Sequence, residues 1–182
     1  GAGTILRKNM TPEKEEKYRA VLAEAIQVGH GILKRGGSSQ EAVEKTINIM
    51  EDSPLFNAGK GAVLNSNASI ELDASFMEGK SLGAGAISGV RTVKNPISAA
   101  IKVMEASPHV MLSGSGADAF SNEQGLEIVS PEYFLTERRI NALKEVQKAS
   151  SMSKTNHKYQ SNDFINQQRY GTVGCVALDI FG

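Results

Sequence analysis

The sequence has 182 residues, of which 40% are apolar and 22% are charged, as in ordinary soluble globular proteins. Its 20 lysine and arginine residues balance its 20 aspartate and glutamate residues, so neither a nucleic-acid partner nor a membrane partner is expected. No apolar run is long enough to cross a bilayer. The single cysteine, Cys175, excludes an internal disulfide and a cysteine zinc site. These features favour a cytoplasmic protein.

The first elements are predicted to be two helices and a loop. Residues 11–13, Thr-Pro-Glu, provide a capping hydroxyl, a proline for the first turn and an acid near the positive end of the helix dipole. An apolar stripe continues to Gly36-Gly37, where this helix is expected to end. Ser38 and Glu41 form a capping box for the second helix. An irregular loop is expected over residues 54–61.

The middle of the chain is predicted to be mainly strands, over residues 62–90 with a turn at 65–67. Alternating apolar residues in 69–77 indicate a half-buried strand, and the glycines in 82–90 suggest that another backbone approaches closely. The later elements are expected to be a helix from Asn95-Pro96 to Ser107, a strand at 110–113 and helices at 117–124 and 137–149. Arg138 and Arg139 of the last helix are expected on its solvated surface.

A change of composition follows in residues 148–170, which are mostly Ser, Asn, Gln and Lys. Such a stretch buries too little apolar surface to offset the entropy of ordering it, so it is predicted to be a mobile linker. Residues 172–181 are almost continuously apolar, which predicts a strand buried on both faces.

The junction of linker and strand, Gly171-Thr172, is a candidate site of chain cleavage. Cleavage there would make Thr172 a new N-terminus, whose α-amino group has a reference pKa of about 7.7–8.0 and can act as the base for its own hydroxyl. The same hydroxyl could make the cut by attacking the carbonyl of Gly171, where the absent Cβ permits a strained backbone. The pair is also compatible with an ordinary turn before a β-branched strand residue.

Several segments of the chain occur in an order that is typical of one family. They are Gly-Ala-Gly at 1–3, Pro-Leu-Phe-Asn-Ala-Gly-Lys-Gly at 54–61, Glu-Leu-Asp-Ala at 71–74, Gly-Ala-Ile-Ser-Gly-Val at 85–90, Lys-Asn-Pro-Ile at 94–97, Ser-Pro-His at 107–109 and Gly-Thr-Val-Gly-Cys-Val-Ala-Leu-Asp at 171–179. Together they resemble the plant-type asparaginases and isoaspartyl peptidases, over essentially the whole chain except the linker.

The resemblance implies an α+β fold, the αββα four-layer sandwich of N-terminal-nucleophile hydrolases, from a chain that is incomplete at both ends. Residues 1–171 would form an α subunit and residues 172–182 the first strand of a β subunit, with a dimer of such pairs as the active form. The implied activity is that of a self-cleaving amidohydrolase. It would hydrolyse L-asparagine and β-aspartyl dipeptides through Thr172, with no cofactor required for the chemistry.

The resemblance also implies binding residues in the 54–61 loop and the helix before it. Asn57 matches an active-site asparagine of the family, although an asparagine that bonds its own loop backbone would look the same. A structural sodium ion would be bound by backbone carbonyl oxygens, which suit hard cations. By position these belong to Met50, Glu51, Ser53, Phe56, Ala58 and Lys60. The Lys60 ammonium group disfavours such a site unless its side chain points away.

Two alternative functions remain open at the level of the sequence. A glycosylasparaginase-like hydrolase would use the same nucleophile on an amide that carries a sugar. A non-catalytic relative, or an unprocessed precursor that acts as a binding protein, would keep the Gly171–Thr172 bond intact.

Overall fold

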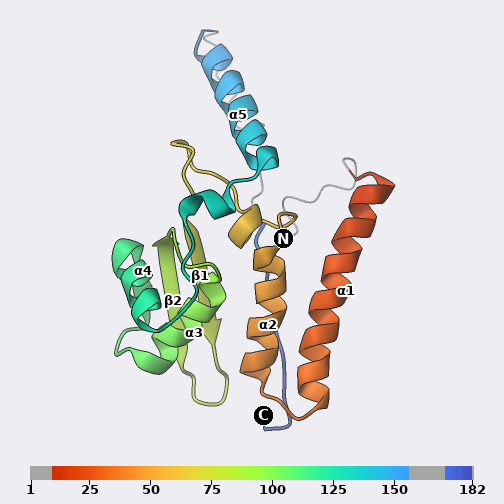
Figure 1. The fold of residues 1–182 in the computed structure, drawn as a ribbon, viewed down its shortest axis with the longest axis vertical. Coiled ribbons are helices and arrows are strands. Elements are labelled where there is room, and N and C mark those ends of the chain that lie inside the picture. Colours follow the sequence, from red (N-terminus) through yellow and green to blue (C-terminus); the bar gives the residue numbers. More distant parts are fainter. Residues whose placement is uncertain (1–9, 156–170, 182) are drawn as a thin grey trace.

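The computed structural model describes residues 10–155 and 171–181, with side chains described for 10–149 and 171–181. Helices α3 and α4 lie against a small sheet, α1 and α2 stand side by side to one side of it, and α5 projects away from the other elements (Figure 1). In chain order the elements are α1 (Pro12–Lys34), α2 (Ser39–Asp52), the 3-10 turn η2 (Gly59–Gly61), β1 (Leu72–Met77), β2 (Ala84–Val90), α3 (Pro96–Ala106), β3 (Met111–Ser113), α4 (Gly114–Glu123), the 3-10 turn η3 (Pro131–Phe134) and α5 (Glu137–Thr155).

Helices α1 and α2 form an antiparallel hairpin, visible side by side in Figure 1. Both predicted N-caps are confirmed. The Thr11 hydroxyl oxygen accepts a hydrogen bond from the Lys14 amide (3.3 Å), and the Ser38 hydroxyl oxygen accepts one from the Glu41 amide (3.1 Å). These bonds satisfy amide groups that have no partner within the first turn of a helix.

The sheet has three strands in the order β1-β2-β3. β1 pairs with β2 in antiparallel fashion, and β2 pairs with β3 in parallel fashion. The parallel pair needs a crossover connection, which α3 provides. Helix α3 packs on β1 and β2 and is buried along much of its length. The side chains between them form a core that also includes Phe134.

The strands are shorter than the sequence predicts. Residues 62–71 lie outside β1 and β2, and the predicted turn at 65–67 is present. The Asn65 side-chain oxygen accepts hydrogen bonds from the amides of Asn67 and Ser69, both at 3.0 Å, so this stretch bonds to itself instead of to a strand. Within β1 the predicted alternation is confirmed, with Leu72 buried and Asp73 exposed.

Helix α5 continues to Thr155, so residues 148–155 are helical where the sequence predicts the start of a linker. A helix satisfies its own backbone hydrogen bonds, which lets a polar sequence remain helical without a buried face. The rest of the predicted linker, residues 156–170, lies outside the described residues.

Residues 171–179 are extended and end in a turn at 180–181, but they are not buried on both faces, contrary to the prediction. Their exposure alternates, and Val176 is 97% exposed while Val173 is partly buried. Among the described residues no strand pairs with this segment. A run of apolar residues cannot reveal from sequence alone whether a second layer covers its other face. Whether the segment begins a β subunit stays a prediction.

The described residues form an α+β fold, as predicted. No helix among them is both long and apolar enough to span a bilayer.

The sheet and α3 approach each other closely at Gly85 of β2, which confirms the interpretation of this glycine. A Cβ built there would lie 2.1 Å from the Ala100 carbonyl oxygen and 2.5 Å from the Met104 amide nitrogen, both backbone atoms of α3. We predict that Gly85→Ala destabilises the natural full-length protein by about 1–3 kcal/mol, because the helix must move off the sheet.

Chemical denaturation of the Gly85→Ala variant measures this loss of stability. Gly79→Ala is the matched control, because nothing lies within 4 Å of the position of its added Cβ. Equal stability of the two variants would contradict the close packing described.

Candidate active site

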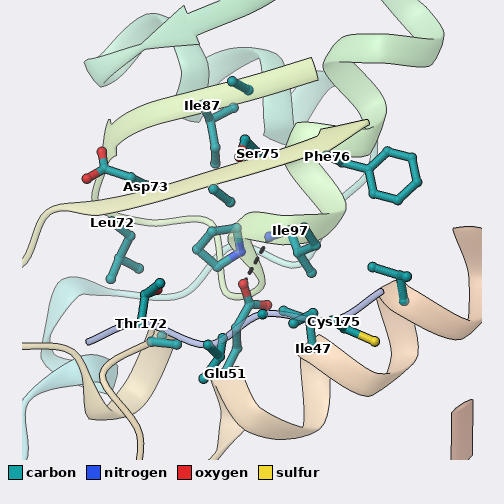
Figure 2. Close-up of a pocket in the computed structure, with 18 of the residues that line it drawn as sticks. Ile47, Glu51, Leu72, Asp73, Ser75, Phe76, Ile87, Ile97, Thr172 and Cys175 are labelled. Atoms are coloured by element: carbon teal, nitrogen blue, oxygen red, sulfur yellow. Dashed lines mark hydrogen bonds between the residues drawn. The ribbon is translucent and has the colours of Figure 1, made fainter. Parts of the chain in front are cut away.

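A cavity of about 900 Å³ lies between α2, strand β1 and the extended segment 171–177. Figure 2 shows Thr172 between the C-terminal part of α2, which carries Glu51, and β1, which carries Leu72. Asn57 and Gly171 also line this cavity. The candidate nucleophile, its preceding residue and the candidate asparagine therefore share one site.

Helix α2 and the loop that follows it hold the segment 171–181 along its length. Val173, Cys175 and Ala177 pack on the apolar cluster of α2, which includes Val43 and Ile47. An extended chain rises about 3.3 Å per residue and a helix about 1.5 Å per residue, so the short segment spans the whole helix.

At the far end of the segment, the Asp179 carboxylate accepts a hydrogen bond from the Ser39 amide (2.6 Å), at the first residue of α2. This bond and a second from the Phe181 amide lower the pKa of Asp179. The carboxylate is therefore placed where a helix N-terminus favours negative charge.

Asn57 lies at the near end of the segment and bridges two parts of the chain. Its side-chain amide nitrogen donates to the Gly171 carbonyl oxygen at 2.7 Å. Its side-chain oxygen accepts from the Val63 amide at 2.9 Å, which fixes the orientation of the amide group. Asn57 therefore bonds the backbone just after its own loop and also reaches the candidate cleavage site, and its role in catalysis stays a prediction.

The Thr172 side chain is exposed and borders the cavity. The carbonyl that precedes it is already hydrogen-bonded by Asn57, which draws electron density away from the carbonyl carbon. Attack on that carbon would place a negative charge on the oxygen that Asn57 contacts. The arrangement is thus suited chemically to stabilise an oxyanion at Gly171.

Glu51 is a buried acid beside the cavity, only 3% exposed. Its carboxyl group accepts from the Ile97 amide (3.0 Å), the dashed line in Figure 2, and from the Asn95 side chain (3.2 Å). Glu51 thereby caps the N-terminus of α3. The side chain of Asn95, the N-cap residue of α3, makes no capping hydrogen bond there. Burial raises the pKa of Glu51 to about 8, against the lowering effect of these hydrogen bonds.

The candidate sodium loop folds back on itself around its glycines. A Cβ built on Gly59, whose φ is +46°, would lie 2.3 Å from the Glu51 carbonyl oxygen, and one on Gly61 would lie 2.1 Å from that of Phe56. The Glu51 and Phe56 carbonyl oxygens of the predicted set therefore lie against these glycines, where a side chain would not fit. The remaining candidates are Met50, Ser53, Ala58 and Lys60. Met50 is buried in the α2 cluster, and its carbonyl accepts from the Ser53 amide.

The Lys60 ammonium group is held outside this loop. Its nitrogen lies 4.8 Å from the centre of the Tyr133 ring on η3, a cation–π contact. In this position the positive charge of Lys60 is directed to the Tyr133 ring and not to a cation in the loop. Among the described residues, no cluster of histidine, cysteine or acidic side chains could hold a metal.

Two functional candidates were not found from the sequence. One is the side chain of Glu51, whose partners Asn95 and Ile97 lie far along the chain and follow no local pattern. The other is Arg139, which is only 8% exposed and donates to the Gly61 carbonyl, so its predicted place on a solvated surface is wrong. Arg138 is exposed, as predicted.

Comparison with known proteins identifies the family. The family model described as asparaginase matches residues 1–182. The chain is 41% identical over 182 residues to the isoaspartyl peptidase of Escherichia coli, covering all of this chain and 56% of that relative. It is 40% identical over 182 residues to the human isoaspartyl peptidase/L-asparaginase, covering all of this chain and 54% of that relative.

The chain therefore belongs to the asparaginase family, which confirms the resemblance noted from its motifs. It spans about half the length of the curated relatives it matches.

The raised pKa of Glu51 predicts a stability that falls with rising pH. Its ordinary value is 4.5 and its value in the fold is about 8, so between these the folded protein holds a proton that the unfolded chain releases. Unfolding is then favoured as pH rises. We expect the unfolding free energy to decrease by an amount on the order of a few kcal/mol between about pH 5 and pH 9.

Denaturation curves of the full-length protein and of Glu51→Gln across this pH range measure the effect. The variant keeps the shape but cannot ionise, so its stability should decrease less. Glu71→Gln is the matched control, because Glu71 lines the same cavity but is exposed. The same pH dependence in all three proteins would exclude Glu51 as its source.

Proposed function

We propose that the full-length protein is a self-cleaving amidohydrolase that hydrolyses L-asparagine and β-aspartyl dipeptides through Thr172. The observation that carries the proposal is the 2.7 Å hydrogen bond from the Asn57 amide to the Gly171 carbonyl oxygen, next to Thr172 in the cavity. The proposal draws further support from the relatives, which are named isoaspartyl peptidase and isoaspartyl peptidase/L-asparaginase.

The first reaction is cleavage of the chain by its own threonine. The Thr172 hydroxyl oxygen attacks the Gly171 carbonyl carbon, and the charge that develops on the carbonyl oxygen is stabilised by the Asn57 amide. The bond from carbon to the Thr172 nitrogen then breaks, the nitrogen takes up the proton that the hydroxyl group gives up, and an ester remains. Water hydrolyses this ester, which leaves a Gly171 carboxylate and a free Thr172 with its amine and hydroxyl.

The second reaction is turnover of substrate by the released Thr172. The α-amino group accepts the hydroxyl proton, and the hydroxyl oxygen attacks the side-chain amide carbon of the substrate. The amine of the substrate leaves with a proton, and an acyl-enzyme forms. Water then releases the aspartyl product. The cavity of about 900 Å³ falls in the usual range for small-molecule sites, which suits an amino acid or a dipeptide.

We further propose that the loop around Gly59 and Gly61 binds sodium through the carbonyl oxygens of Met50, Glu51, Ser53, Phe56, Ala58 and Lys60. The crowding of the Glu51 and Phe56 carbonyls about the glycines supports this assignment. The ion would balance the carbonyl dipoles and stabilise the loop that carries Asn57, without taking part in the chemistry.

The remaining proposals concern the whole protein and rest on family membership. The four-layer αββα sandwich is the proposed complete fold, of which α1, α2 and the sheet would be parts. Residues 1–171 are proposed as the α subunit, with a dimer of α/β pairs as the assembly and the cytoplasm as its location.

Cleavage is predicted to depend on Thr172 and Asn57. The intact mass of the full-length protein, followed at neutral pH, should show two fragments, the second beginning at Thr172. The Thr172→Ala variant should stay uncut, because it lacks the attacking hydroxyl. Asn57→Ala should cleave roughly a hundred- to a thousandfold more slowly, because it lacks the oxyanion donor.

Asn67→Ala, in an exposed turn, is the matched control and should cleave like the unaltered protein. The cleaved protein is then assayed with asparagine, with β-aspartyl dipeptides and with a sugar-bearing asparagine. A preference for the last would favour the glycosylasparaginase alternative. A chain that stays uncut under all conditions would leave a non-catalytic binding protein.

The sodium proposal predicts an ion-specific gain in stability. The thermal midpoint of the full-length protein should be higher in sodium chloride than in choline chloride of the same ionic strength, because only the folded loop binds the ion. Gly59→Ala should abolish this difference, since the added methyl group fills the space in front of the Glu51 carbonyl. Equal midpoints in both salts would rule out the site.

A further inference from the structure

Two adjacent arginines in the first turn of α5 contact the loop that carries Asn57. Arg139 donates from its Nε to the Gly61 carbonyl oxygen at 2.7 Å. Arg138 donates from its Nη1 to the Leu55 carbonyl oxygen at 3.2 Å. The two carbonyl groups lie on either side of Asn57 in the sequence, so α5 holds the loop at both ends.

Arg139 differs from an ordinary surface arginine in its burial. Its side chain is buried, and burial together with the neighbouring Arg138 lowers its pKa. Its Nη2 has no hydrogen-bond partner within the described part of the chain, where no carboxylate forms an ion pair with it either. Burying an unpaired cation is costly, so stability alone gives a poor reason for an arginine here.

Arg138 acts on the same loop together with a tyrosine from α1. The Tyr18 hydroxyl donates to the Leu55 carbonyl oxygen at 2.9 Å and itself accepts from Arg138 at 3.2 Å. The Tyr18 ring also packs edge-on against Phe56, with 5.5 Å between ring centres. The Leu55 carbonyl is therefore held from two helices at once.

The loop between these two fastened carbonyls has little freedom to move. Gly61 lies so close to the Phe56 and Pro54 carbonyls that a Cβ would not fit. Asn57 is bonded to the backbone just after this loop, because its side-chain oxygen accepts from the Val63 amide. The position of its side-chain amide relative to Gly171 therefore follows from the position of the whole loop.

We propose that Arg139, with Arg138, is a positioning residue for cleavage of the Gly171–Thr172 bond, because the pair holds the loop where the Asn57 amide reaches the Gly171 carbonyl. The inference rests on the proposed function, since it concerns the self-cleavage step. Neither arginine contacts the reacting atoms, and both act through Asn57.

The test is a double-mutant cycle on the rate of self-cleavage, measured by intact mass on the full-length protein. The variants are Arg139→Lys, Asn57→Ala and their combination. Lysine keeps the charge but lacks the Nε donor geometry. We expect Arg139→Lys to cleave about ten- to a hundredfold more slowly, as for loss of a hydrogen bond from a charged donor.

The combined variant decides between positioning and a merely structural role. If Arg139 acts through Asn57, the combination should cleave no more slowly than Asn57→Ala alone. If Arg139 only stabilises the fold, the two losses should multiply, and the proposal is overturned. Cleavage of Arg139→Lys at the unaltered rate would overturn it too.

Arg138→Lys repeats the cycle at an exposed position, where the substitution does not disturb the core. If Arg139→Lys fails to fold, the Arg138→Lys cycle decides between positioning and a merely structural role. Arg19→Lys, an exposed arginine paired with Glu15 on α1, is the matched control and should cleave normally. If the unaltered protein itself does not cleave, both the proposed function and the positioning role fail. This outcome is distinct from slow or normal cleavage of the variants beside a cleaving unaltered protein.

Discussion

The hydrogen bond from the Asn57 amide to the Gly171 carbonyl is the interaction on which the site depends. It joins a loop after α2 to the beginning of the extended segment, across most of the chain length. A single bond of this kind is worth only about 1 kcal/mol, so it cannot by itself position either partner. Its geometry must come from the elements that hold each side.

Helix α2 supplies most of that support. Its N-terminal end binds Asp179, its apolar face packs against alternate residues of the extended segment, and the chain leaving its C-terminal end presents Asn57. Glu51, in the last turn, ties the same helix to the start of α3 and so to the sheet. One rigid helix thereby relates the candidate nucleophile, the oxyanion donor and the sheet to each other.

Features that depend on neighbours in sequence were predictable, and features that depend on distant contacts were not. The caps at Thr11 and Ser38 are local, and both were correct. The buried Arg139 and the capping by Glu51 join residues far apart in the chain, which no periodicity reveals. The apolar run after Thr172 indicated an extended segment. Whether both of its faces are buried depends on which elements pack against it, and the run itself does not reveal them. Asn57 was identified through the family motif, and its partner atom came only from the structure.

The most direct test of this account is a crystal structure of the full-length Thr172→Ala protein, in which the bond after Gly171 should remain uncut. We expect the Asn57 amide nitrogen to lie within hydrogen-bond distance of the Gly171 carbonyl oxygen, with the position of the missing hydroxyl facing the carbonyl carbon. An Asn57 side chain turned away from an uncut Gly171 carbonyl would contradict this prediction, because the Asn57 amide is the donor proposed to stabilise the oxyanion.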